Sequence, residues 1–350
     1  MRITIRKEFK PIRKAKTAWG ATKPQFKVML VIGIACMIIF PVYARVSYLT
    51  SSNNTNNNNG NNNGDPGTQG SIIDHNCAHL EDFINIPSYW INRARTDLHV
   101  AYWHTSHGSQ LVSGMNELDA FIGGTGAYLY NNGGSGGTLD LEEVSDDYSE
   151  RHLSGNIDSA DPPGRDFDDT TRIFLNDAAN SDVNVVMWSW CSLSTDFNII
   201  DTYLSKMNQL ESEYPDVYFI YMTGHLNGGG ETGAVHLANE RIRDYCRNNT
   251  KFLYDFADIE SYDPDDNYFL DQGADDACNY DGGNNWAEEW QAAHSTTGMT
   301  STSDIAHSYA NGGTWFHCSP SHAASAHVMG NMKAYGVWYL LAILAGWSGN

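Results

Sequence analysis

The chain has 350 residues, with 21 lysines and arginines against 42 aspartates and glutamates, which gives a formal net charge of −21. Ten of the basic residues but only one acidic residue fall within positions 1–50, so 51–350 carries 11 basic and 41 acidic residues. This balance excludes a nucleic-acid partner, which needs clustered cations, and a hydrophobic content of 41% excludes a chain that is disordered throughout.

The N-terminal segment has the features of a membrane-targeting signal. Residues 28–44 (VMLVIGIACMIIFPVYA) are 17 uncharged and mostly apolar positions, close to the roughly 20 that a membrane-spanning helix needs. Nine basic residues in 1–27 precede them, a bias that keeps the N-terminus inside and exports the body. Two interpretations stay open: a retained transmembrane signal-anchor, or a secretory signal peptide cleaved after Ala44. Both predict a protein that is anchored at the cell surface or secreted.

Residues 45–70 predict a flexible linker, because 51–70 (SSNNTNNNNGNNNGDPGTQG) contains no large apolar side chain to bury. Asn-x-Thr triplets begin at Asn53 and Asn248, and an exported location makes them candidate glycan acceptors. Residues 71–350 then form one large domain.

The cysteines show no spacing that suggests a zinc site, and we predict neither a metal nor a cofactor. One of the six, Cys36, lies in the apolar run. For the other five, an oxidising exterior predicts one or two disulfides.

Short apolar runs alternate with helical patterns along the body. Strands are predicted at 98–103, 183–188, 217–222 and 251–256, and helices at 110–121, 198–213, 234–247 and 334–347. Near-continuous apolar strands between helices are typical of a parallel sheet that is covered on both faces. We therefore predict a three-layer α/β/α sandwich with a mostly parallel sheet of about five strands. The stretches 123–137 and 258–315 are predicted as loops or small insertions, the second one built over the site.

Polar and titratable residues follow each predicted strand. They lie in His104–Ser109, in Ser189–Ser192, in Thr223–His225 and at Asp255 and Asp258. Ligands bind at the carboxyl ends of strands in such sheets. We therefore expect a common set of residues to gather on that face: His104, Ser106, His107, Cys191 and His225.

Ser106 is the candidate nucleophile, because it stands at a strand–turn–helix junction with Gly108 two residues on. A serine needs a base within hydrogen-bond reach, and the backbone N–H groups of a helix start suit an oxyanion. His322 and His327, just before the last helix, are the candidate bases.

In order and placement, residues 95–347 resemble the SGNH/GDSL hydrolase superfamily of serine esterases. The resemblance rests on His104-Thr105-Ser106 in place of its Gly-Asp-Ser turn and on Ser319-Pro320-Ser321-His322 in place of its Asp-x-x-His block. It implies an SGNH-like (flavodoxin-like) fold, Ser106 as the nucleophile, His322 as the base and Gly155 as an oxyanion donor. Cys191 stands where the family has its oxyanion asparagine, and Ser319 stands where it has its triad aspartate.

Two functions follow from these observations. The first is a surface-anchored serine esterase that acts on acyl esters of a polysaccharide or glycan, with His104, His107, His225 and Trp190 lining its substrate pocket. Trp286 and Trp315 also fall in loop-like contexts, where exposed indoles stack on sugars. The alternative is a catalytically degenerate carbohydrate-binding or structural surface glycoprotein, which the two replaced family residues favour.

Overall fold

The computed structural model describes residues 70–144, 152–154, 157, 166–294 and 298–349. The predicted basic segment 1–27, the apolar run 28–44 and all but the last residue of the linker 45–70 lie outside this range. Within it, no helix combines the length and the apolar character that crossing a membrane requires.

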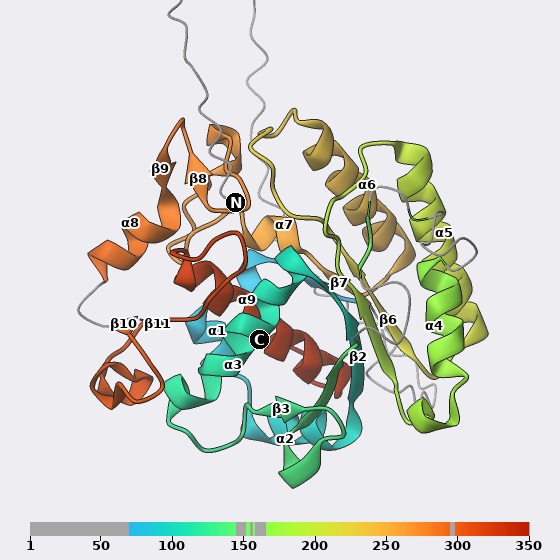
Figure 1. Ribbon diagram of the computed structural model, residues 1–350, viewed down its shortest axis with the longest axis horizontal. Coiled ribbons are helices and arrows are strands. Elements are labelled where there is room, and N and C mark those ends of the chain that lie inside the picture. The colour runs from blue at the N-terminus through green and yellow to red at the C-terminus, as the bar shows by residue number, and fades with distance from the viewer. Residues whose placement is uncertain (1–69, 145–151, 155–156, 158–165, 295–297, 350) are drawn as a thin grey trace, which may run out of the picture. The chain divides into compact units, whose positions relative to one another are not determined.

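A central sheet of seven parallel strands organises the body (Figure 1). Its spatial order is β1-β7-β6-β5-β2-β4-β3. The strands are β1 (Ile72–Ile73), β2 (His99–Trp103), β3 (Tyr130–Asn131), β4 (Leu139–Glu143), β5 (Val185–Trp188), β6 (Tyr218–Met222) and β7 (Leu253–Tyr254). The α/β class and the parallel sheet are therefore confirmed, with seven strands in place of about five.

Helices cover both faces of the sheet (Figure 1). The helices are α1 (Leu80–Ile84), α2 (Ser88–Asp97), α3 (Ser109–Ile122), α4 (Phe167–Leu175), α5 (Phe197–Glu213), α6 (Ala234–Asn249), α7 (Phe256–Ile259), α8 (Trp286–Ala293) and α9 (His327–Leu344). On one face α9 packs against α1, α2 and α3, and on the other α5 packs between α4 and α6. This burial on two sides explains why the central strands are apolar at nearly every position.

The central strands β2 and β5 pair in a register that decides where the site forms. Trp103 lies opposite Trp188, and their indoles stack with centroids 4.5 Å apart. From β2 the chain moves outward to β3 and β4, and then returns to β5, β6 and β7 on the other side. The boundary between β2 and β5 is thus the topological switch point, where ligands bind in open α/β sheets.

Helix α9 begins at His327, seven residues before the predicted start at 334. The polar residues Asn331 and Lys333 weaken the apolar pattern there, yet both are fully buried. Asn331 donates from Nδ2 to the backbone oxygen of Phe316 at 3.0 Å, and Lys333 pairs with Glu260 at 2.7 Å. Burial is tolerated because these polar groups are satisfied within the protein.

Three strands escaped prediction because they are short or polar. The edge strands β1 and β3 have two residues each, and β4 (LDLEE) carries three acids. The stretch 258–315 contains α8 and two small two-stranded sheets, formed by β8 (Asn279–Tyr280) with β9 (Asn284–Asn285) and by β10 (Gly298–Met299) with β11 (Trp315–Phe316).

The expected disulfides are absent among the described cysteines. Cys77, Cys191, Cys246, Cys278 and Cys318 are all free thiols. The prediction of one or two disulfides was therefore wrong, and three of these cysteines are buried as single thiols. Cys246 is buried on α6, and Cys318 packs at the start of α9, where its sulfur faces the backbone oxygen of His327.

Candidate functional site

Ser106 lies on a strained turn directly after β2. It opens the short 3-10 helix η3 (Ser106–Gly108) and has a φ of 45°, in the left-handed region that residues other than glycine rarely adopt. A serine held on such a strand-to-helix turn lies above the sheet, an arrangement also found in hydrolases that have a sharp turn at the serine. Helix α3 follows at once, so the turn sits at a helix start.

Gly108 makes this turn possible because the backbone passes close to β5. A Cβ at this position would lie 2.1 Å from Oγ of Ser189 and 2.7 Å from Cβ of His104. The carbonyl oxygen of Gly108 also accepts from the hydroxyl of Tyr102 at 2.9 Å. The turn therefore packs against Ser189 after β5 and is hydrogen-bonded to Tyr102 of β2.

His322 meets Ser106 from a segment 216 positions further along the chain. Its Nε2 is hydrogen-bonded to Oγ of Ser106. His322 also has a positive φ, 66°, so both partners are held in left-handed backbone. His327 does not reach the serine: its Nδ1 lies 2.7 Å from the backbone oxygen of Cys318, and its ring stacks on His317. Of the two candidate bases, the structure pairs His322 with Ser106.

A buried polar network holds the segment that carries His322. Nε2 of Gln110 donates to the carbonyl oxygen of Ser321 at 2.5 Å. Oε1 of Gln110 accepts from the ammonium of Lys333, which in turn contacts Glu260 at 2.7 Å. All three side chains are fully buried, so helix α3 and helix α9 position the segment of His322 through fixed hydrogen bonds.

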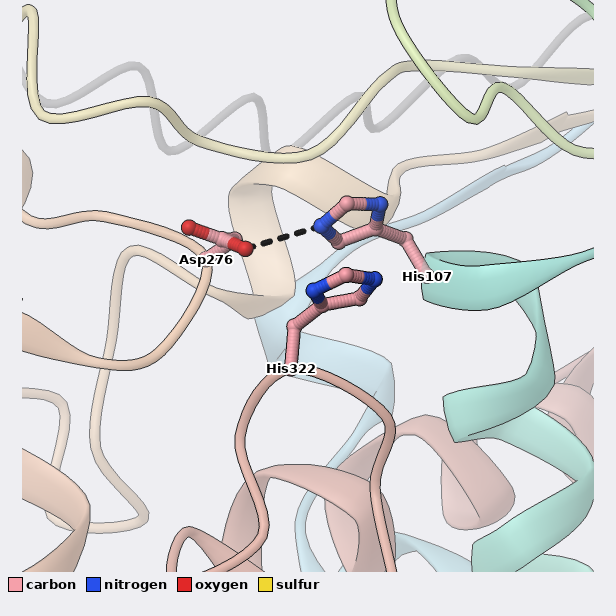
Figure 2. A group of neighbouring side chains, drawn as sticks. All are labelled: His107, Asp276 and His322. Carbon is pink, nitrogen blue, oxygen red and sulfur yellow. Dashed lines mark hydrogen bonds and ion pairs between the residues drawn. The ribbon is translucent and has the colours of Figure 1, made fainter. Parts of the chain in front are cut away.

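His107 lies between two other imidazoles. Its ring stacks on that of His322 with centroids 4.2 Å apart and on that of His225 at 3.7 Å. Figure 2 shows the parallel rings of His107 and His322, with Asp276 reaching His107 from a neighbouring loop. Nε2 of His107 lies 2.8 Å from Oδ2 of Asp276. The site thus contains a second imidazole beside His322, and this one is bonded to a carboxylate.

Asp276 determines the protonation of His107. Burial alone would lower the pKa of His107, but the hydrogen bond with Asp276, the neighbouring thiol of Cys191 and the charge of Glu260 raise the pKa to about 9. The same contact with His107 keeps the pKa of Asp276 below its ordinary value, although burial opposes this. At neutral pH the pair is therefore an imidazolium and a carboxylate.

The loop around Asp276 folds on the carboxylate of its neighbour. Oδ1 of Asp275 accepts from the backbone N–H groups of Ala277 and Asn279 at 3.0 and 2.8 Å. The stretch Asp263–Asn267 has the same pattern, in which Asp263 accepts from the N–H groups two and four positions on. The acidic stretch Asp263–Asn267 is therefore a turn closed by a buried aspartate, and the equivalent turn at Asp275–Asn279 presents Asp276 to the site.

Cys191 follows β5, where the switch-point register places it opposite the Ser106 turn. The interaction with His107 lowers the pKa of its thiol, burial opposes this, and Thr105 and Ser106 lower it further. Its backbone N–H donates to the carbonyl oxygen of Leu153 at 2.8 Å. That N–H is therefore occupied and is not available to an oxyanion.

Three further residues were predicted for the site, and each has a different placement. His225 joins the stack, and its Nε2 lies 3.0 Å from the carbonyl oxygen of Cys191. His104 turns away toward Glu143 at the end of β4, at 2.9 Å. Gly155 lies outside the described residues.

The expectation that Trp190 lines the pocket was wrong. Its side chain is 2% exposed, and its Nε1 donates to the backbone oxygen of Met222 at 3.1 Å. Trp286 and Trp315 are likewise buried, at 1% and 7% exposure. The packed layers enclose these indoles because their large apolar area is worth more in the core than at the surface.

Proximity alone would allow a metal ion at three clusters of the described residues. These clusters are His107 with Asp276 and His322, Asp74 with His75 and Asp258, and His99 with Asp140 and Asp182. At the site itself the rings of His107 and His322 are parallel within 10°, so their lone pairs lie in separate planes. Metal-bound imidazoles must point both lone pairs at one ion about 2 Å away. The stacked arrangement suits hydrogen bonding instead.

Surface hollows also occur away from the Ser106 turn. One of about 490 Å³ is bordered by α5 and α6, and its lining, which includes Phe197 and Arg241, contains no serine, cysteine or histidine. The chemistry of the side chains, rather than the size of the hollow, locates the candidate site.

The chain matches no protein-family model, no curated protein and no solved structure. The described residues themselves define an α/β protein with a parallel sheet, which has a serine, a cysteine and three imidazoles at its switch point.

Sequence reasoning missed Asp276. The available signal was weak: two Asp-x-x-x-Asn turns, at Asp263–Asn267 and Asp275–Asn279, of which only the second has an acid directly after its first aspartate. The contact of Asp276 with His107 spans 169 positions and depends on how the loop folds.

Proposed function

We propose that this protein is a serine hydrolase of carboxylic esters, with Ser106 as the nucleophile and His322 as the general base. The observation that carries this proposal is the hydrogen bond between Oγ of Ser106 and Nε2 of His322 at the switch point of the sheet. A serine hydroxyl is too weak an acid to attack alone, and an imidazole in contact with it supplies the base that it needs.

In the reaction, Nε2 of His322 takes the proton from Ser106 as Oγ adds to the ester carbonyl carbon. The protonated His322 then gives that proton to the leaving alcohol oxygen, and an acyl-serine remains. Water adds to the acyl-serine with His322 again as the base, which releases the acid and restores Ser106. The backbone N–H of Ser106 is the proposed donor to the oxyanion.

His107 supplies the charge that an oxyanion site needs. Cys191 is a weak hydrogen-bond donor, and its backbone N–H is engaged with Leu153. The imidazolium of His107 stands beside both Cys191 and His322 and provides a fixed positive charge close to the developing oxyanion. Asp276 balances this charge, so that His322 accepts a proton next to a pair that is neutral overall.

The finer parts of the proposal rest on the sequence. The resemblance to SGNH/GDSL esterases favours an SGNH-like arrangement and acyl groups on a polysaccharide or glycan as the substrate. The basic segment 1–27 and the apolar run 28–44 favour a location at the cell surface, on a membrane helix or after secretion.

A degenerate carbohydrate-binding or structural protein is the second candidate, and one observation favours it. Within the described part of the chain no carboxylate is hydrogen-bonded to His322, and the exposed Ser319 stands where a triad aspartate would be expected. Loss of the orienting acid in a triad costs orders of magnitude in rate.

Hydrolysis of aryl acetates and acetylated sugars by the intact protein and by Ser106→Ala separates the two. We expect the wild type to turn over an aryl ester, and Ser106→Ala to lose at least about a thousandfold in kcat/KM with an unchanged circular dichroism spectrum. Ser192→Ala, an exposed serine next to Cys191, is the matched control and should keep its activity. No turnover of any ester by the wild type would favour the binding protein, and full activity in Ser106→Ala would exclude the serine mechanism.

A further inference from the structure

We propose that Cys191 is a reactive thiol activated by His107 and Asp276, that hydroperoxides oxidise it to a sulfenic acid, and that its modification blocks the serine site. The reactivity stands on its own geometry; the blocking rests on the proposed function.

The geometry of His107 carries the first step. The side chain of His107 is 9% exposed, and its Nε2 is bonded to Asp276. Its Nδ1 is buried and makes no hydrogen bond of ordinary geometry, so this is the nitrogen left to face the neighbouring thiol of Cys191. A buried N–H with no firm partner is costly, and a thiolate is the acceptor that would satisfy it.

The groups around Cys191 favour its ionised form. His107, Thr105 and Ser106 on the β2 turn all lower the pKa of its thiol, while burial raises it. From β6, His225 contacts the carbonyl oxygen of Cys191, and His322 stacks on the far side of His107. The two acids nearby, Asp276 and Glu260, act on His107 and hold it protonated up to a pH of about 9. His107 is therefore a cation beside the thiol of Cys191 up to a pH of about 9, and this charge increases the share of Cys191 that is ionised.

This thiolate has a balanced reaction with a hydroperoxide. The sulfur attacks the terminal oxygen of the O–O bond, that bond breaks, and the sulfur is oxidised to a sulfenic acid. The hydroperoxide is reduced to an alcohol, whose oxygen takes its proton from the imidazolium of His107. The added oxygen would stand between Cys191 and Ser106, where the acyl group of a substrate must lie.

Cys77 offers an internal comparison. Both Cys77 and Cys191 are free and half-buried, but burial and the charge of Asp74 raise the pKa of Cys77 to about 12. The neighbouring charged groups, rather than the exposure to solvent, therefore distinguish the thiol of Cys191 from that of Cys77.

The first arm of the test measures alkylation of the intact protein by iodoacetamide at pH 7, followed by peptide mass spectrometry. We expect Cys191 to react at least about tenfold faster than Cys77. His107→Gln and, as a second variant, Asp276→Asn should lower the alkylation rate of Cys191 by about tenfold. The difference in rate between wild type and variants should become smaller toward pH 9.5. His104→Gln is the matched control, because His104 contacts Glu143 and not the thiol. Equal rates for Cys191 and Cys77, or a Cys191 rate that neither His107→Gln nor Asp276→Asn changes, would overturn the proposal.

The second arm treats the protein with hydrogen peroxide, traps sulfenic acid with dimedone and measures ester hydrolysis. We expect the dimedone adduct on Cys191, with loss of ester hydrolysis that Cys191→Ala prevents. Absence of the adduct would overturn the oxidation step, and an adduct without loss of hydrolysis would overturn the blocking step. If the untreated protein hydrolyses no ester, the proposed function fails while rapid labelling of Cys191 still supports the reactive thiol.

Discussion

Two pairs, each of a hydroxyl or thiol side chain with an imidazole, lie at the carboxyl ends of neighbouring strands, and their imidazoles have different partners. Ser106 after β2 faces His322, an exposed residue with no carboxylate on it among the described residues. Cys191 after β5 faces His107, which is buried and bound to Asp276. The difference fits the acidities of the nucleophiles. A hydroxyl needs a neutral imidazole that accepts its proton, whereas a thiol needs a cation that stabilises its anion.

The largest effect should come from removing His322, the imidazole that has no carboxylate partner among the described residues. His322→Gln is expected to lower kcat/KM for an aryl ester by about 10²–10⁴-fold, the usual contribution of a general base. His327→Gln is the matched variant, since His327 lies in the same segment but contacts Cys318 and His317. It should retain most of the activity. Similar losses in both variants would contradict the assignment of His322 as the base.

Removing a hydrogen bond that positions the Ser106–His322 pair should leave the Cys191–His107 pair unaffected. Gln110→Met keeps the size of the side chain but removes its bond to Ser321, so we expect ester hydrolysis to fall by about tenfold or more. The alkylation rate of Cys191 should stay constant. Gln291→Met is the control, because Gln291 holds Ser325, at the other end of the same segment. Equal changes in hydrolysis and alkylation in Gln110→Met would show that the two pairs are not independent.

The loss of ester hydrolysis at alkaline pH should report the titration of His107, the imidazole that is bonded to Asp276. Because the pKa of His107 is raised to about 9, ester hydrolysis should decline as the pH rises through about 9 and the positive charge is lost. In Asp276→Asn this decline should begin about one pH unit or more lower. Glu143→Gln, which removes the partner of His104, serves as the control. A limb that does not move in Asp276→Asn would contradict the role of His107.

The smallest effect concerns stability. A histidine whose pKa is raised on folding stabilises the protein fully below its unfolded pKa of about 6.5, and this contribution is lost as the pH rises through the folded value. The pair of His107 and Asp276 should therefore lose on the order of 1 kcal/mol between pH 6.5 and pH 9.5, a figure reduced because Asp276 is partly exposed. Urea unfolding at the two pH values checks this: the wild type should lose more than Asp276→Asn, and equal losses would argue against the ion pair.

Much of the architecture follows from local pattern. Continuous apolar runs predicted β2, β5 and β6, and amphipathic spacing predicted α3, α5 and α6, to within about two residues. These predictions succeeded because the pattern of polar and apolar side chains reflects which faces of an element are buried. Short edge strands such as β1 carry too few residues for any such signal.

In the candidate site, too, local sequence predicted some features and tertiary structure decided the others. Ser106 and His322 were predictable because a strand-to-helix turn and the segment before the last helix are positions that the chain order itself defines. Their contact, the stacking of His107 on two imidazoles and the approach of Asp276 were decided by tertiary structure alone. Each joins residues more than 100 positions apart, through the register of β2 with β5 and the folding of the loop at Asp275–Asn279. Polarity along the chain sets which faces are buried, but only packing determines which polar groups meet there.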